Sequence, residues 1–398
     1  MARVFVSIGA GAQQLPLIEA ARRLGFSVAA IDRNPAAPGF SLSEHSFQCS
    51  IAKPATMRRM LAELKSEIHG VAARSFGPAL LSSSALCRAF GVPGPGPSSV
   101  AFFKNKRRFK QTLVRAGIQC PRSFSWKSQF ERNAIYEAGD LIARPAAGFG
   151  KMNVRLLREL SDKRALLDSI DDESILLEEL LENGTELTVL GASHQGTYRN
   201  LLITSKVISN EPPLFAEIMH RYPALVPPFI LREIEGIVQR IVTLSGLATS
   251  PLVTEFIYLR GQLYLIEASP EIGGEFLADY AFTAVTGQSY FDWLVRLLTE
   301  DRMPEIPAAT HAAVIRFLLP QEGVLRSVQF PDWLARSAEF LFEKVLLSPG
   351  KQTSLQRGNL ERLAAFGLSS SLDSIESLVG LANHAAEETR INYEISQP

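Results

Sequence analysis

Glu255 and Glu267 stand in an otherwise mostly apolar stretch, TEFIYLRGQLYLIEASPE, residues 254–271. A turn centred on Arg260-Gly261-Gln262 predicts a β-hairpin in which the two glutamates are directly paired and point to the same side. Like charges in that position destabilise a hairpin, and a cation held between them removes the cost. The pattern therefore predicts a clamp for Mg²⁺ or Mn²⁺, with Ser269 and Glu271 following on the same face. The alternative is an exposed hairpin with solvated charges, which the apolar neighbours disfavour.

A glycine-rich segment, AAGFGKMN at residues 146–153, joins two expected strands and carries Gly148, Gly150 and Lys151. It does not match the Walker A pattern, because Met152 follows the lysine where Ser or Thr is required. Backbone N–H groups and a lysine in such a loop can still cover phosphates. An ordinary hairpin loop remains an open alternative.

A second acidic segment, ILLEELLENGTEL at residues 175–187, contains Glu178, Glu179 and Glu186 around a glycine turn. Taken alone, it fits the end of an acidic helix as well as it fits a binding segment.

The segment GAGAQQ follows the first expected strand, and Asp32 ends the second, which suggests a dinucleotide-binding turn. Gln14, however, stands where the third glycine of that fingerprint allows close packing of helix and strand. A structural glycine turn, or one that touches a substrate carboxylate, fits better.

The bulk composition excludes several classes of protein. The chain has 398 residues, 46% of them apolar, which is enough for two or three domains. Its 41 basic and 41 acidic residues cancel, so neither nucleic acid nor an anionic membrane is an expected partner. No apolar run is long enough to span a bilayer. Three cysteines without metal-ligand spacing indicate a reducing cytoplasm, and the apolar N-terminus continues into a helix rather than a signal-peptide cleavage site.

The expected elements divide the chain into three parts. Strands and helices alternate over roughly the first 95 residues, which predicts an open parallel sheet. GVPGPGPSSV reads as a domain boundary, and residues 102–117 read as one amphipathic helix. After residue 307 the pattern changes to short strands with one long helix. We therefore expect domains at 1–97, 98–305 and 306–398, with a smaller unit at about 123–190.

In this order the segments resemble the ATP-grasp superfamily, in particular its carboxylate-amine ligases and biotin-carboxylase-like members. KNKRRFKQTLVRAGIQCPRSF resembles the family's D-K helix, and IARPAAGFGKMNV resembles its lid loop. LLEELLENGTELTV resembles its hinge, and TEFIYLRGQLYLIEASPEIGGE resembles its metal-binding strand pair. The resemblance covers the whole chain and implies an α/β fold: a Rossmann-like N-terminal domain, an ATP-grasp fold of two α+β subdomains and a small C-terminal α+β domain.

The resemblance also implies residue roles, carried over position by position. Lys106, Arg144 and Lys151 would contact phosphates, with Gly148 and Gly150 in the lid loop. Glu178 would reach the adenine, with Glu179 and Leu180 beside it in the hinge, and Glu186 would reach the ribose. Glu255, Glu267 and Ser269 would bind Mg²⁺ or Mn²⁺. The substrates would meet Glu271, Gly273, His220 and Arg221, the last two in the segment EIMHRYPA.

Three departures from the family pattern bear on activity. Ser269 replaces an asparagine metal ligand, so a second metal is expected to bind weakly or not at all. Glu271 replaces an arginine that in many relatives holds a substrate carboxylate, and an acidic group suits an ammonium or a further cation instead. Arg144 replaces a lysine. The positive charge is kept, but it is carried by a planar guanidinium group instead of an ammonium.

The expected function is ATP-dependent coupling of a small carboxylate to an amine through an acyl phosphate, with homodimer formation as a family-level expectation. A non-catalytic relative that binds nucleotide is the main alternative. A nicotinamide-dependent dehydrogenase rests only on the N-terminal βαβ unit and is the weakest of the three.

Overall fold

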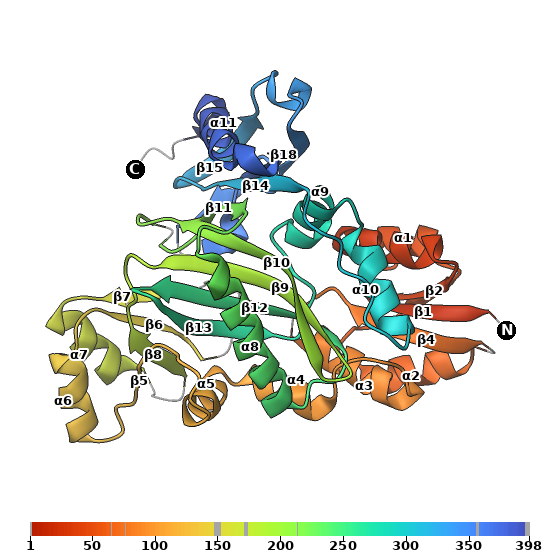
Figure 1. The fold of residues 1–398 in the computed structure, drawn as a ribbon, viewed down its shortest axis with the longest axis horizontal. Helices are drawn as coiled ribbons and strands as arrows, with labels where there is room; N and C mark the ends of the chain where they lie inside the picture. The colour runs from red at the N-terminus through yellow and green to blue at the C-terminus, as the bar shows by residue number, and fades with distance from the viewer. Residues whose placement is uncertain are drawn as a thin grey trace.

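A computed structural model describes residues 2–64, 66–75, 77–146, 153–170, 174–212, 214–355 and 358–394 (Figure 1). No helix in these ranges is long and apolar enough to cross a membrane. The described strands form four sheets, and the largest of them runs through the middle of the molecule.

The N-terminal sheet is parallel throughout, as the alternating pattern predicts. Its strands lie in the order β3-β2-β1-β4. The strands are β1 (Arg3–Ile8), β2 (Ser27–Asp32), β3 (His45–Gln48) and β4 (Glu67–Ala73), and the helices are α1 (Leu15–Arg23), α2 (Pro54–Ala62) and α3 (Pro78–Phe90). Apolar residues on both faces of the strands are buried, which is the reason for their nearly continuous apolar sequence.

The single amphipathic helix expected at residues 102–117 is in fact two helices, α4 (Pro97–Lys104) and α5 (Lys106–Arg115). Asn105 between them has extended backbone angles, and its side chain accepts a hydrogen bond from the backbone N–H of Arg108 at 3.0 Å. Asparagine is among the best N-cap residues, so the chain restarts a helix here. The break leaves Lys106 in the first turn of α5.

The smaller unit is an antiparallel sheet in the order β5-β8-β6-β7. Its elements are β5 (Ser123–Phe124), α6 (Gln129–Glu137), β6 (Leu141–Pro145), β7 (Arg155–Leu157), α7 (Leu160–Ser169) and β8 (Ile175–Glu179). The sheet ends with Glu179, earlier than the expected boundary near residue 190, because the next strand belongs to the large sheet. In Figure 1 this unit lies at the far end from the N-terminus.

The large sheet has eight strands in the order β13-β12-β9-β10-β11-β14-β18-β16. They are β9 (Thr185–His194), β10 (Thr197–Ile208), β11 (Glu217–Tyr222), β12 (Ser250–Leu259), β13 (Gln262–Ser269), β14 (His311–Leu318), β16 (Phe340–Val345) and β18 (Ala364–Ser371). Helix α8 (Pro228–Ser245) covers one face (Figure 1). Since β11 pairs with β14, strands expected in a separate C-terminal domain extend the sheet that carries the hairpin.

The rest of the C-terminal part packs against this extension. A three-stranded sheet contains β15 (Gly323–Gln329), β17 (Gln352–Thr353) and β19 (Arg390–Glu394), and helix α11 (Ile375–Glu388) contacts β14 and β18.

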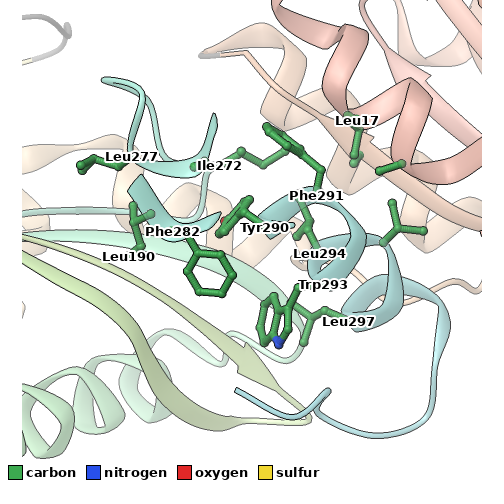
Figure 2. Close-up of a cluster of buried hydrophobic side chains, with 14 of the residues drawn as sticks. Leu17, Leu190, Ile272, Leu277, Phe282, Tyr290, Phe291, Trp293, Leu294 and Leu297 are labelled. Atoms are coloured by element: carbon green, nitrogen blue, oxygen red, sulfur yellow. The ribbon is translucent and has the colours of Figure 1, made fainter. Parts of the chain in front are cut away.

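One apolar core joins the N-terminal sheet to the large sheet. Helix α10 (Tyr290–Thr299) packs against α1, and Figure 2 shows Leu17 of α1 on one side of Phe291 and Leu294, and Leu190 of β9 on the other side of the cluster. Ile272 and Leu277 enter the same core and flank the Gly-Gly turn at 273–274. Burial of each large apolar side chain contributes about 1.5–3 kcal/mol. The core therefore holds both ends of that turn in place.

Candidate active site

A cavity of about 1450 Å³ lies where all these parts of the structure meet. It collects most of the residues that the sequence singles out: Lys106, Arg144, Glu178, Glu179, Leu180, Glu186, Glu255, Glu267, Ser269, Glu271 and Gly273. The glycine-rich segment with Gly148, Gly150 and Lys151 lies outside the described residues. The N-terminal and C-terminal parts also contribute to the lining, including Gln13 and Arg362.

The hairpin pairs Glu255 with Glu267, as predicted. Its tip differs from the expectation, because the turn has two residues, Arg260 and Gly261, with φ of 49° and 81°. Two-residue turns with positive φ at both positions suit the twist of a hairpin. A β-bulge between Glu255 and Phe256 supplies the extra residue that restores the glutamate pair.

Each carboxylate of the pair lies against its own lysine. Lys106 Nζ is 3.1 Å from Glu267 Oε1, and Lys206 Nζ is 3.2 Å from Glu255 Oε1. Burial alone would raise the pKa of Glu267, but Lys106 and Arg144 outweigh it and hold the pKa below the ordinary value. These positive charges thus offset the repulsion between Glu255 and Glu267, a role that the sequence analysis assigns to a metal ion.

The donor set still fits a hard divalent cation. Two carboxylates that line one cavity are ligands of the kind that Mg²⁺ and Mn²⁺ prefer. Among the described residues no group of three or more His, Cys, Asp or Glu side chains could hold a metal. Glu255 and Glu267 would therefore supply two ligands, and Mg²⁺ commonly takes the others from water and substrate phosphates.

Lys206 is the centre of a buried ion cluster that the sequence did not suggest. Its Nζ lies 3.2–3.5 Å from carboxylate oxygens of Glu186, Glu217 and Glu255, and its side chain is 1% exposed. Burial would lower the pKa of Lys206, but Glu255 and the other two carboxylates raise it well above the ordinary value. Lys206 thus stays charged and fixes Glu186 and Glu255 on neighbouring strands.

Glu178 is the centre of a second cluster. Its Oε2 accepts hydrogen bonds from Arg144 Nη2 at 2.7 Å and Nε at 3.2 Å, and its Oε1 accepts one from Lys110 Nζ. The side chain is 2% exposed. Burial would raise the pKa of Glu178, but Lys110 and Arg144 lower it below the ordinary value. Both oxygens are engaged, so this geometry orients Arg144 and does not support direct contact between Glu178 and adenine.

Arg144 in turn connects the small sheet to the hairpin. Its Nη2 donates to the carbonyl of Ile266 at 3.2 Å, and its Nη1 lies 3.8 Å from Glu267. The guanidinium therefore reaches the carboxylate pair directly, which favours its expected role beside phosphates.

The hinge residues follow β8 along one side of the cavity. Glu179 is held by Arg122 through two hydrogen bonds, from Glu179 N to Arg122 O at 2.9 Å and from Arg122 N to Glu179 Oε1 at 2.8 Å. Leu180 N donates to Asp140 O at 3.0 Å. The hinge is thus anchored up to Leu180, and its continuation to Gly184 lines the cavity.

Ser269 and Glu271 line the cavity beyond the glutamate pair. Burial raises the pKa of Glu271 to about 7, with nearby Glu267 adding to the effect and a hydrogen bond to Ser269 opposing it. Each substitution relative to the family pattern thus changes the cavity wall itself.

His220 and Arg221 lie on strand β11 rather than in a substrate loop, and neither lines the cavity. Arg221 Nη2 is 2.7 Å from Glu376 of α11, outside the site. His220 is buried and reaches the cavity only through Glu275, whose Oε2 is 2.9 Å from His220 Nε2. This placement does not favour direct substrate contact by either residue.

Glu275 and Phe276 follow the Gly-Gly turn with φ of 58° and 61°. Two consecutive left-handed residues other than glycine cost about 1–3 kcal/mol each, and such strain persists only where the surroundings hold it. Glu275 is held by His220 and by Arg362 Nη2, 2.6 Å from its Oε1. Arg362 also pairs with Glu217, so the C-terminal part fixes the turn. The sequence analysis missed Lys110, Lys206 and Arg362. Only Lys110 had a signal in the sequence, because it lies four residues after Lys106 on the same helix face.

The N-terminal glycine turn does not have the arrangement of a dinucleotide site. Asp32 accepts hydrogen bonds from the backbone N–H groups of Ala10 and Asn34, both at 2.9 Å, which engages both of its oxygens. The side chain of Gln14 packs over Gly9 and donates to Arg74 O at 2.6 Å. Gln13 lies on the cavity wall, so the turn faces the same site as the hairpin.

Comparison with solved structures identifies the fold. An L-amino acid ligase from Bacillus licheniformis matches with a TM-score of 0.80 and 19% identity over 98% of this chain and 99% of that one. N5-carboxyaminoimidazole ribonucleotide synthetase from Thermotoga maritima matches with a TM-score of 0.72 and 17% identity over 99% and 100%. The biotin carboxylase domain of Hydrogenobacter thermophilus 2-oxoglutarate carboxylase, in complex with ADP, magnesium and bicarbonate, matches with a TM-score of 0.72 and 17% identity over 98% and 90%.

Sequence comparison adds little. No family model matches the chain. An uncharacterised protein of Sinorhizobium fredii, y4rH, is 25% identical over 210 residues, which span 48% of this chain and 40% of that protein. The structural matches show that the chain has the ATP-grasp fold over nearly its whole length, which confirms the fold that the motifs imply.

Proposed function

We propose that this protein is an ATP-dependent ligase that activates a small carboxylate as an acyl phosphate and couples it to an amine. One observation carries the proposal: two cations, Lys106 and Arg144, and two paired carboxylates, Glu255 and Glu267, meet in one cavity of an ATP-grasp fold. Cations and metal-binding carboxylates in one site suit a polyphosphate. The names of the matched proteins, among them an L-amino acid ligase, agree with this reaction class.

ATP would lie along the cavity from the hinge to the hairpin. The backbone beyond Leu180 would meet the adenine edge, and Glu186, fixed by Lys206, would accept hydrogen bonds from the ribose. Lys106 and Arg144 would turn from Glu267 towards the phosphates. Mg²⁺ or Mn²⁺ held by Glu255 and Glu267 would neutralise phosphate charge.

The chemistry then requires positioning more than covalent help from the protein. A carboxylate oxygen of the first substrate attacks the γ-phosphorus, the bond to ADP breaks, and an acyl phosphate forms. The amine attacks the acyl carbon, inorganic phosphate leaves and the amine loses a proton. Glu271, where many relatives have an arginine, would hold the amine as its ammonium form before attack. The glycine-rich loop at 146–153 is proposed to cover the phosphates.

The test is an assay that does not require the natural amine. Purified protein is incubated with ATP, Mg²⁺, a panel of carboxylic acids and hydroxylamine, which traps acyl phosphates as hydroxamates. We expect ADP and hydroxamate to form in equal amounts, and only when an acid is present. ADP binding without turnover of any acid would instead support a non-catalytic nucleotide-binding protein, the alternative that Ser269 and Glu271 favour.

We further propose that the protein works in a reducing compartment such as the cytoplasm, because Cys49, Cys87 and Cys120 are all unpaired and buried. A homodimer is proposed from the family resemblance, and light scattering of the purified protein tests it.

A further inference from the structure

The cavity is larger than MgATP requires. Pockets for drug-sized ligands measure about 300–1000 Å³, whereas this one measures about 1450 Å³. Residues of the Gly-Gly turn and of the C-terminal part, among them Phe276, Leu346 and Leu360, form part of its lining.

The wall at this end of the cavity includes a group of aromatic and apolar side chains beside charged residues that are paired with one another or, like Lys344, lie over the rings. Phe276 and Tyr280 line it with ring centroids 6.0 Å apart, and Phe342 packs behind both, 4.8 Å and 4.1 Å from the respective rings. Leu346 and Leu360 complete the lining. We refer to the space between Phe276, Tyr280, Leu346 and Leu360 as the aromatic chamber.

Phe276 lines the chamber with its backbone in a strained, left-handed conformation. A left-handed conformation is unusual for a bulky residue, and the contacts of Glu275 with His220 and Arg362 hold it in place. Strain that several contacts maintain is common at ligand sites. The Phe276 ring packs against Phe317 and Phe342 of the core on one side and lines the cavity on another, so both the core and the held turn fix its position.

The chamber remains partly open in the folded protein. Leu346 and Leu360 are 39% and 43% exposed although both line the cavity. Lys344 Nζ lies over both rings, 5.6 Å from the Phe276 centroid and 5.2 Å from that of Tyr280. Among the described residues no carboxylate is paired with Lys344, so its positive charge disfavours a cationic group beside the rings.

We propose that the acid activated by this enzyme carries a branched or aromatic apolar group, and that the aromatic chamber binds that group while the carboxylate reaches the hairpin. The inference rests on the proposed function and names its substrate class. The chamber is continuous with the cavity of Glu255 and Glu267, and the Gly-Gly turn connects the two. The polar groups of this wall are already engaged: Glu275 and Asn359 are paired, and Asp279 pairs with Arg74. The Lys344 ammonium lies over the two rings, so a polar tail would lose hydration and meet only groups that already have partners.

The test compares 3-phenylpropanoate and 4-methylpentanoate with acetate and glutarate in two measurements. The first is kcat/KM in the ATP and hydroxylamine assay. The second is calorimetric binding of each acid to the protein with MgADP, which needs no turnover. We expect the apolar acids to exceed acetate and glutarate by about tenfold to a hundredfold in both measurements.

A matched pair of variants locates the effect. Leu346→Glu puts a charge in the chamber, whereas Val345→Glu puts the same charge on the adjacent residue, which is 49% exposed and does not line the cavity. Both residues lie at the surface, so both variants should fold. We expect Leu346→Glu to lose at least tenfold in binding of the apolar acids while its value for acetate stays the same, and Val345→Glu to match wild type.

The outcomes separate this inference from the proposed function. Selective binding of apolar acids without hydroxamate formation refutes the ligase and supports the chamber. Hydroxamate formation with equal preference for acetate or glutarate supports the ligase and refutes the chamber. Equal effects of Leu346→Glu and Val345→Glu on binding also refute it.

Discussion

Glu255 and Glu267 are direct cross-strand partners, yet their carboxylates contact different lysines, Lys206 on strand β10 of the same sheet and Lys106 at the start of α5. The paired acids are thus stabilised by cations from two different parts of the chain. Lys206 is fully enclosed and has two further carboxylates, whereas Lys106 is 16% exposed and can move. We therefore expect Glu267 to be the carboxylate that exchanges its lysine for a metal ion.

Replacing Glu267 with glutamine should lower ATP-dependent turnover by about a thousandfold, because it removes the charged metal ligand that neutralises phosphate. Mn²⁺ binding in the presence of ADP, followed by electron paramagnetic resonance, should weaken in parallel. Glu376→Gln is the matched control, since Glu376 pairs with Arg221 outside the cavity. Turnover at the wild-type rate in Glu267→Gln would rule out the proposed metal site.

Replacing Lys110 with methionine should destabilise the protein by about 3–5 kcal/mol, because Glu178 would stay buried with only Arg144 as a partner. Denaturant unfolding measures the difference. Lys104→Met, at an exposed position of α4, should change the free energy of unfolding little. A Lys110→Met protein as stable as the control would show that the Glu178 cluster contributes nothing.

The same cluster makes the protein sensitive to acid. The folded-state pKa of Glu178 lies below its ordinary value of 4.5, so its contribution to stability is complete above pH 4.5 and is lost as the pH falls through the folded pKa. Thermal unfolding between pH 7 and pH 3 should show this loss in wild type. In Glu178→Gln the melting temperature should be lower at pH 7 but fall less steeply below pH 4.5, and an unchanged slope would contradict the assignment.

Gly273 and Gly274 should respond differently to alanine. A Cβ at Gly273 would lie 2.3 Å from Leu190 Cδ2, whereas one at Gly274 would meet nothing within 4 Å. Overpacking of this kind costs about 1–3 kcal/mol. Gly273→Ala should therefore lower the free energy of unfolding and displace the turn, while Gly274→Ala should leave the stability close to wild type. Equal stability of the two variants would show that Leu190 gives way freely.

The sequence predicted those features that depend on local pattern. Alternation of strands and helices was enough for the N-terminal sheet, and the hairpin pattern was enough for the pairing of Glu255 with Glu267. The hairpin also shows the limit of local patterns. The predicted turn was one residue too long, and Glu255 pairs with Glu267 only because a bulge follows Glu255. A bulge depends on packing against β9 and α8, which no local pattern contains.

The remaining features arise from contacts between distant segments. Lys206 and Arg362 look like ordinary charged residues in the sequence, and their roles follow from three carboxylates and a strained turn that only the fold brings to them. The break at Asn105 could have been predicted, since asparagine followed by a helical segment is an N-cap signal. His220 and Arg221 were misplaced because strand β11 reads as a polar loop when its pairing with β14 is unknown.

The pairing of β11 with β14 has a consequence for the integrity of the molecule. A protein ending near residue 305 would retain every group proposed to hold nucleotide, but it would expose the unsatisfied backbone edge of β11 to other chains. It would also lack Arg362, the counter-charge for Glu217 and Glu275. Residues 306–398 thus cannot be removed without loss of the rest, and shortened versions should precipitate or self-associate rather than remain folded as a minimal enzyme.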